Sequence, residues 1–237
     1  FVSVTNPQLS PNFYAVIPAG GVGSRLWPIS RPEHPKFLHD LTGAGSSLLQ
    51  QTYDRLAEFL PAASILVVTG EAHQQAVNDQ LEDLVSANLF LEKSPKDSTA
   101  AIALAAAILA KRQPDVIVGS FAADHVIVEG AKFEKTVREA IEVAASGKIV
   151  TIGITPTEPS VGFGYIKTGD RIEDTETARE VAKFVEKPNI EKAKRYVESG
   201  KYLWNAGMFI APARLLLDQL AKSEPQLHAS IIEIADS

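Results

Sequence analysis

Three glycines followed by two cations near the N-terminus are the residues of this chain best suited to chemistry on a phosphate. They come directly after an apolar run and comprise Gly20, Gly21, Gly23, Arg25 and Lys36. Because glycine has no Cβ, the backbone can take positive φ values there and its N–H groups can approach a phosphate closely. The arginine and the lysine add fixed positive charge. The pattern therefore predicts an anion-binding loop.

Two common glycine motifs do not match this loop. The Walker motif places a lysine directly after its last glycine, whereas the first lysine after Gly23 is Lys36, thirteen residues later. The dinucleotide-binding motif opens a helix, and Pro28 and Pro32 oppose an immediate long helix here. We therefore expect a phosphate site of a different geometry.

Two polar residues farther along the chain lie beside strands that the sequence predicts. Asp124 comes shortly after a strand expected over 115–120, and a single aspartate with open neighbouring positions suits Mg²⁺. Its alternative role is in a turn or a helix cap. Asn205 precedes a strand expected over 207–211 and can present both donors and an acceptor to a polyol.

Two further pairs have an ordinary structural explanation beside the functional one. Glu186 and Lys187 end a predicted strand before Pro188. Adjacent strand side chains point to opposite sides, so one is expected to face the site, unless a bend at the rim lets both contribute. The alternative is an exposed pair. Asp97 and Ser98 precede an alanine-rich helix, which they are suited to cap.

The elements that must position these residues alternate between strand and helix over the first two thirds of the chain. Buried strands are expected over residues 13–17, 65–69, 90–91, 116–118 and 149–154, with helices between them. One helix is expected to point inward the side chains of Val77, Leu81, Leu84 and Val85. The alternation predicts an α/β fold with a mixed, mostly parallel sheet, helices on both faces and a ligand-binding rim where the strands end.

After Pro159 the sequence no longer predicts alternating strands and helices. Short strands expected over 164–168 and 181–186, with only the polar stretch 169–180 between them, indicate a small antiparallel insertion. The α/β order then resumes with a helix, a strand and a helix, over 190–199, 207–211 and 212–222.

The composition of the 237 residues limits the classes of partner. The longest apolar run, 100–110, is too short to cross a bilayer, and without cysteine the chain has no disulfide, thiolate metal site or cysteine nucleophile. A net charge of −6 argues against a broad nucleic-acid surface, yet residues 20–36 carry three cations against one acid. We expect a soluble, cytoplasmic protein that binds small anions, with neither nucleic acid nor membrane as a partner.

Six motifs in a fixed order resemble the nucleotidyltransferases that make nucleotide sugars, and in particular the mannose-1-phosphate guanylyltransferases. They extend from about residue 13 to about residue 228. One such motif is weak, whereas six in order are specific. The motifs read Ala-Gly-Gly-Val-Gly-Ser-Arg-Leu-Trp-Pro with Pro-Lys-Phe-Leu, Ala-Ile-Ala-Leu-Ala-Ala, Ala-Asp-His-Val-Ile, Gly-Phe-Gly-Tyr-Ile, Phe-Val-Glu-Lys-Pro and Leu-Trp-Asn-Ala-Gly-Met-Phe.

The resemblance implies a Rossmann-like fold of the nucleotide-diphospho-sugar transferase type, Mg²⁺ as cofactor, and a reaction. GTP and mannose 1-phosphate would give GDP-mannose and pyrophosphate by in-line attack of the sugar phosphate on the α-phosphorus. Arg25 and Lys36 would neutralise the departing pyrophosphate, Asp124 would hold Mg²⁺, and Lys187 would orient the sugar phosphate. The implied nucleotide contacts are Ala19, Gly20, Gly21, Gly23, Ser24, Arg25, Asp97 and Ser98. The implied sugar contacts are the side chains of Glu186 and Asn205 and the backbone of Gly164 and Tyr165.

The chain departs from the family pattern in three ways. Asp97 stands where the family usually has an asparagine, so this carboxylate either accepts from a guanine edge or caps the helix. The family's second metal-binding aspartate and its C-terminal region have no counterpart before Ser237. We therefore expect a loose arm over 1–12 and one domain over 13–237 that lacks its C-terminal part.

These departures leave alternatives open. The base or the hexose could differ, so the enzyme could be a pyrophosphorylase for another nucleotide or another hexose 1-phosphate. The chain could also be a nucleotide-sugar-binding module without turnover. The sequence does not determine the oligomeric state, for which a homodimer remains one option.

Overall fold

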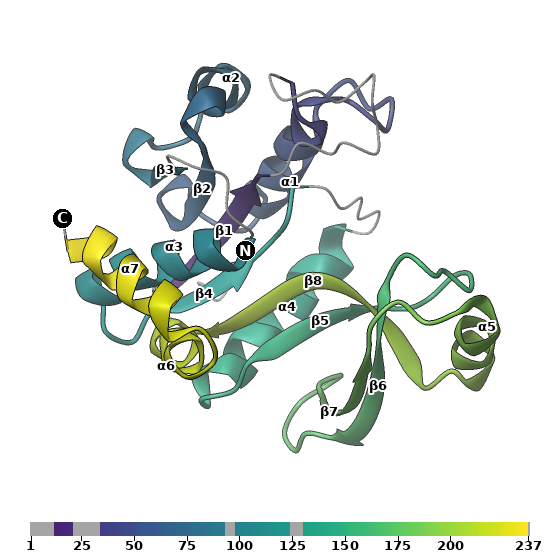
Figure 1. The fold of residues 1–237 in the computed structure, drawn as a ribbon. Coiled ribbons are helices and arrows are strands. Elements are labelled where there is room, and N and C mark those ends of the chain that lie inside the picture. Colours follow the sequence, from purple (N-terminus) through teal and green to yellow (C-terminus); the bar gives the residue numbers. More distant parts are fainter. Residues whose placement is uncertain (1–11, 21–33, 93–97, 124–129, 237) are drawn as a thin grey trace, which may run out of the picture.

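The computed structural model describes residues 12–20, 34–92, 98–123 and 130–236, and Figure 1 shows them as one sheet surrounded by helices. The strands are β1 Phe13–Ala19, β2 Ile65–Gly70, β3 Leu89–Glu92, β4 Ile117–Ser120, β5 Val150–Ile154, β6 Gly164–Arg171, β7 Arg179–Val185 and β8 Tyr202–Pro212. The helices are α1 Leu48–Ala57, α2 Gln74–Gln80, α3 Ser98–Arg112, α4 Gly130–Ala145, α5 Ile190–Ser199, α6 Ala213–Ser223 and α7 Pro225–Asp236. Short 3-10 turns are η2 Lys36–Leu38, η3 Ala62–Ser64, η4 Glu71–His73 and η5 Ser86–Asn88.

The sheet has two parts that differ in strand direction. Strands β3, β2, β1 and β4 are neighbours in that order and pair in parallel. Next to them β8 pairs antiparallel with β4, β5 and β6, and β7 pairs antiparallel with β6. Six of the eight strands thus run in one direction, against β7 and β8. This is the mixed, mostly parallel sheet with an antiparallel addition that the sequence predicts.

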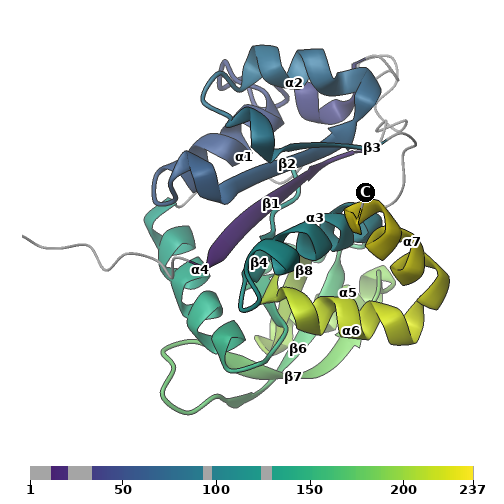
Figure 2. The ribbon, with the colours of Figure 1, turned by 90° about the vertical axis from the view of Figure 1, so that its left-hand side faces the viewer.

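Helices cover both faces of the sheet, because β1 is apolar on both faces. Phe13, Ala15 and Ile17 alternate along β1 and pack with α1, α2 and α4. Val16 points to the other face and packs with alanines of α3, beyond which lie α6 and α7. Figure 2 shows α3, α6 and α7 together on one side, with α4 on the other. No helix in the described part of the chain is long and apolar enough to cross a membrane.

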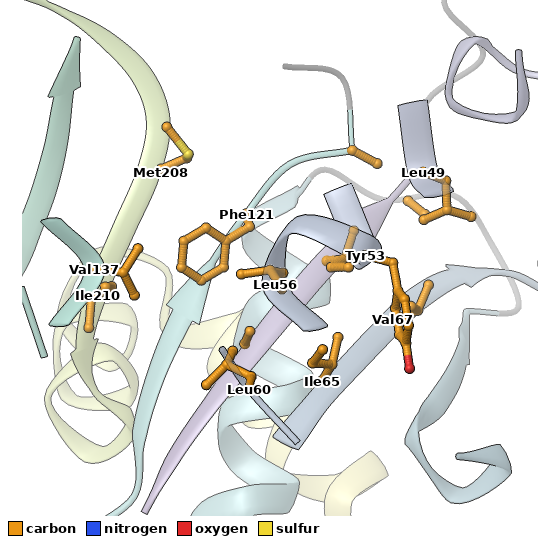
Figure 3. Close-up of a cluster of buried hydrophobic side chains, with 14 of the residues drawn as sticks. Leu49, Tyr53, Leu56, Leu60, Ile65, Val67, Phe121, Val137, Met208 and Ile210 are labelled. Atoms are coloured by element: carbon orange, nitrogen blue, oxygen red, sulfur yellow. The ribbon is translucent and has the colours of Figure 1, made fainter. Parts of the chain in front are cut away.

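The larger core lies between α1, α4 and the sheet. Leu49, Tyr53 and Leu56 follow one another on the inner face of α1 and are at most 3% exposed. They lie against β2 and near Phe121, as Figure 3 shows. Helix α1 begins where Ser47 and Gln50 form a capping box, which satisfies two otherwise unpaired N–H groups. The packing of this core fixes the positions of β1, β2 and β4, at whose ends the candidate site lies.

Three local expectations are wrong. Helix α2 ends at Gln80, so Val85 lies outside it and is 39% exposed. Strands β6 and β7 extend into the polar stretch 169–180, since a hairpin pairs its backbone groups whatever the polarity of its side chains. Strand β8 begins at Tyr202, because its first half pairs with β6. Asn205 therefore lies inside a strand.

The predicted arm over 1–12 lies outside the described residues except for Asn12. The structure therefore leaves this part of the chain as a prediction.

Candidate functional site

A cavity of about 700 Å³ lies where the parallel strands end. Gly20 lines it at the end of β1, Ser98 at the start of α3 and Lys36 in η2. Ala123, after β4, and Gly207 of β8 line it too. Gly20 and Ser98, which the resemblance assigns to the nucleotide, and Lys36, which it assigns to the leaving pyrophosphate, are thus brought together from segments far apart in the chain.

The strand that leads into the glycine loop is firmly held. Ala19 pairs with Thr69 of β2, and the Thr69 hydroxyl donates a hydrogen bond to the Ala19 carbonyl at 2.7 Å. Both residues are fully buried. Gly20 does not adopt a left-handed backbone, and a Cβ built on it would meet no described atom within 4 Å. At this position glycine keeps space open rather than permitting a strained turn.

The other members of the loop, Gly21, Gly23, Ser24 and Arg25, lie outside the described residues, as do Asp97 and Asp124. Their roles remain predictions. Ala122 and Ala123 line the cavity, so Asp124 directly follows a cavity residue in the sequence. The described residues contain no group of three or more side chains placed to hold a metal.

The turn η2 holds Lys36 at the cavity through its neighbours. Phe37 is buried and packs edge-on against the ring of His73, with 5.8 Å between the ring centroids. The Leu38 carbonyl accepts a hydrogen bond from the side chain of Gln80 at 3.1 Å. Burial, followed by the nearby His34, lowers the pKa of His73, which favours the neutral form of the imidazole that packs against Phe37.

Glu92 is a cavity residue that the sequence reasoning missed. It is the last residue of β3, and it is the only carboxylate among the described residues that line the cavity. Lys36 is the only described cation there. The rule that ligands lie beyond the carboxyl ends of parallel strands could have identified Glu92, since it directly follows the strand predicted over 90–91.

A second group of predicted residues forms a row across the antiparallel part of the sheet. Asn205 of β8 pairs with Gly164 of β6 on one side and with Gly153 of β5 on the other. The carboxylate of Glu186 reaches over Gly164, where a built Cβ would lie 3.0 Å from its Oε2. In the row of Glu186, Gly164, Asn205 and Gly153, an amide and a carboxylate thus lie on either side of Gly164, which has no side chain.

The last two predicted residues of this group, Lys187 and Tyr165, differ in exposure: the lysine is exposed and the tyrosine is buried. Lys187 has a φ of 33°, and its Nζ lies 3.1 Å from Oε1 of Glu186, so the two side chains meet although they are neighbours in sequence. The Tyr165 side chain is fully buried, and its hydroxyl donates to the carbonyl of Ser160 at 2.8 Å. The tyrosine ring therefore supports the sheet and is not exposed to a ligand.

Strand β8 connects the cavity with the row. Asn205 belongs to the row, and the next two residues, Ala206 and Gly207, line the cavity. Figure 1 shows β8 passing from the lobe with β6 and β7 to the centre of the sheet. Gly164, Glu186 and Lys187 do not line the cavity themselves. The arrangement can hold a ligand with an anionic part in the cavity and a polyol part at the row.

The chain is similar to known nucleotidyl transferases. The nucleotidyl transferase family model matches residues 14–236. Mannose-1-phosphate guanylyltransferase RfbM of Salmonella typhimurium is 42% identical over 221 residues, which are 92% of this chain and 45% of that protein. Mannose-1-phosphate guanylyltransferase of Escherichia coli is 42% identical over 220 residues, which are 90% of this chain and 46% of that protein. The chain thus spans about half the length of the curated relatives it matches.

The fold is also found among solved structures. A protein of Thermus thermophilus, described as a mannose-1-phosphate geranyltransferase, superposes with a TM-score of 0.84 at 27% identity. The match covers 95% of this chain and 65% of that chain. Since the family model extends over nearly all of the chain, the protein belongs to the nucleotidyl transferase family.

Proposed function

We propose that the protein transfers GMP from GTP to mannose 1-phosphate, which forms GDP-mannose and pyrophosphate. The observation that carries the proposal is the cavity at which Gly20, Lys36 and Ser98 meet, continued by β8 into the row around Asn205. The choice of substrates is supported by the relatives that are 42% identical and bear the name mannose-1-phosphate guanylyltransferase.

In this reaction an oxygen of the sugar phosphate forms a bond to the α-phosphorus of GTP. The bond from that phosphorus to the bridging oxygen breaks, and its electron pair leaves with the pyrophosphate. The glycine loop would bind the nucleotide phosphates through backbone N–H groups, and Lys36 with Arg25 would stabilise the charge on the leaving group. The start of α3 at Ser98 adds the positive end of a helix dipole.

The acceptor would bind at the row. Glu186 would accept hydrogen bonds from hexose hydroxyl groups, Asn205 would bind beside it across Gly164, and Lys187 would orient the sugar phosphate. Holding both substrates at fixed positions replaces a collision in solution by a reaction within one complex, which accounts for much of the catalysis of phosphoryl transfer.

Mg²⁺ is the proposed cofactor. Asp124, which follows the cavity wall in sequence, would hold it together with phosphate oxygens and water, a ligand set that this ion prefers. When bound, the ion would supply positive charge at the reacting phosphates.

The test is release of pyrophosphate by the full natural chain from GTP and mannose 1-phosphate. The four nucleoside triphosphates and several hexose 1-phosphates are compared side by side. Turnover with another pair would give the enzyme a different substrate, and absence of turnover with all pairs would contradict the proposal. Tight binding of GDP-mannose in calorimetry without any turnover would indicate a nucleotide-sugar-binding module.

We further propose that residues 13–237 belong to one nucleotidyltransferase domain that acts in the cytoplasm, and that the protein forms a homodimer. Light scattering on the natural chain measures the assembly. A monomer at all concentrations would contradict the dimer.

A further inference from the structure

The amide of Asn205 is held in one direction by its own chain. Its Oδ1 accepts a hydrogen bond from the backbone N–H of Gly207 at 3.2 Å and another from the hydroxyl of Thr151 at 3.3 Å. An amide turned by 180° would place its NH₂ group against the Gly207 N–H, donor against donor. The oxygen therefore points into the protein, and none of the residues that the structure describes accepts a hydrogen bond from Nδ2.

Thr151 reaches Asn205 because β8 carries a bulge. From one pair to the next, β5 advances two residues, from Thr151 to Gly153, while β8 moves four, from Phe209 to Asn205. The extra residues turn at Gly207, whose φ of 73° lies in the left-handed region that favours glycine. The Thr151 hydroxyl, also 3.3 Å from the Met208 carbonyl, thus spans the bulge.

Asn205 lies between Gly153, where the Leu203 side chain packs closely, and Gly164, where Phe184 and Glu186 lie close. Glycines pair with Asn205 on both sides, so neither neighbouring strand places a Cβ there. Beyond Gly164 the carboxylate oxygens of Glu186 can accept hydrogen bonds. Asn205 and Glu186 therefore offer a donor and an acceptor on the two sides of Gly164. The sequence predicts that Asn205 presents both donors and an acceptor to a ligand, but its Oδ1 acceptor already binds Thr151 and Gly207.

We propose that Thr151 is a positioning residue. Together with the Gly207 N–H it fixes the Asn205 amide so that the NH₂ group donates to an oxygen of the sugar phosphate. The identity of that ligand rests on the proposed function, whereas the direction of the amide depends on this chain alone. Thr151 itself does not touch the substrate.

Kinetics of the full natural chain test the consequence for the substrate. Thr151→Val removes the hydroxyl at nearly constant shape, and Thr151→Ser retains it. We expect Thr151→Val to raise the KM for mannose 1-phosphate by about 3- to 10-fold, as loss of one hydrogen bond does, with the KM for GTP within about twofold. Thr151→Ser restores the wild-type value. Asn205→Asp, which removes the donor itself, raises the KM for mannose 1-phosphate further.

A matched control lies in the same sheet. The Thr168 hydroxyl also bonds to a carbonyl of a neighbouring segment, that of Lys201 at 3.3 Å, and lies outside the row. Thr168→Val is expected to leave both KM values unchanged. If Thr151→Val leaves the KM for mannose 1-phosphate unchanged, raises both KM values equally, or is matched by Thr151→Ser, the proposal is overturned.

Nuclear magnetic resonance tests the amide direction without any turnover. In protein labelled with ¹⁵N-asparagine, Asn205→Asp identifies the side-chain NH₂ signals of Asn205 by their loss. Thr151→Val is expected to shift and broaden these signals, whereas Thr151→Ser and Thr168→Val leave them in place. Unchanged signals in Thr151→Val overturn the proposal even if the wild-type enzyme acts on another sugar. Absence of turnover in wild type, with the expected spectra, contradicts only the proposed function.

Discussion

At the scale of single residues, the site depends as much on side chains that are absent as on those that are present. Gly164 and Gly153 flank Asn205; the missing Cβ at Gly164 lets the Glu186 carboxylate reach over the strand, and the missing Cβ at Gly153 makes room for Leu203. Glycine in a strand interior weakens the strand, because it adds chain entropy to the unfolded state and has no side chain to pack. The glycine at position 164 is explained by the close approach of Glu186, which a Cβ would displace.

Gly164→Ala tests this explanation. The new methyl group would lie 3.0 Å from both Oε2 of Glu186 and the ring of Phe184, and both side chains have to move. We expect the KM for mannose 1-phosphate to rise by about 3- to 10-fold, the size of one displaced hydrogen bond, while the melting temperature changes little. At Gly162 a Cβ would meet its nearest neighbour at 3.5 Å, so Gly162→Ala is the matched control. A Gly164→Ala enzyme with wild-type kinetics would contradict the role of Gly164 in placing the Glu186 carboxylate.

Lys36 is the second test at this scale. Lys36→Met keeps most of the apolar stem but removes the charge from the cavity wall. We expect kcat to fall by about 10²- to 10³-fold, as loss of one preorganised charge contact to a leaving group does. Steady-state pyrophosphate release measures it, with the exposed Lys201→Met as control. Equal rates in both variants would remove Lys36 from the mechanism.

At the scale of elements, Gln80 joins three segments that place Lys36. From the end of α2 its side chain accepts a hydrogen bond from the Ser47 hydroxyl at 2.6 Å and donates one to the Leu38 carbonyl at 3.1 Å. Its own carbonyl accepts from the side chain of Gln50 at 3.1 Å. The start of α1, the end of α2 and the turn η2 are therefore linked through one residue.

Gln80→Ala should loosen this junction. We expect the free energy of unfolding to fall by about 1 to 3 kcal/mol, because two partly buried polar partners lose their hydrogen bonds. Turnover should fall as well, because η2 holds Lys36. Gln75→Ala, on the exposed surface of the same helix, should cost less than about 0.5 kcal/mol. Denaturant unfolding compares them, and equal losses would show that Gln80 is not a structural link.

At the scale of the whole molecule, a carboxylate ties the antiparallel hairpin to α4. Glu139 accepts hydrogen bonds from the backbone N–H groups of Thr177 at 2.7 Å and Ala178 at 3.3 Å, and from the Thr177 hydroxyl. Beside it, Lys135 pairs with Glu176 at 2.6 Å. The lobe with β6 and β7, which carries half of the row, is thus fastened to the helix layer at its far end.

This fastening predicts a pH dependence. Burial acts to raise the pKa of Glu139, but the hydrogen bonds from Thr177 and its neighbours outweigh burial and lower the pKa below its ordinary value of 4.5. Folding therefore favours the ionised form, so the stabilisation is complete well above pH 4.5 and is lost as the pH falls below it. The melting temperature of wild type should exceed that of Glu139→Gln at pH 6, and this difference should disappear as the pH is lowered to about 3.5. A difference that does not change with pH would contradict the role of the ionised form.

The sequence by itself determined the alternation of strands and helices and the place of the glycine loop at the end of β1. Both are local: the spacing of apolar residues sets each element, and Gly20 and Ser98 adjoin an element that is readable from its own residues. Helix α5 follows its expected bounds, with Asn189 as its cap and Gly200 after its end. The sequence places Val85 in α2, but α2 ends at Gln80, whose side chain forms a hydrogen bond to Leu38 of another segment.

Only the tertiary structure decided which side chains of the site face one another. The row of Glu186, Gly164 and Asn205 comes from the register among β6, β7 and β8, and the bulge at Gly207 turns the Asn205 amide toward Thr151. Register depends on pairing between segments distant in sequence, and shifting it by one residue would move every side chain to the other face. The motifs name the residues of the site, but the pairing of the strands fixes the direction in which each one acts.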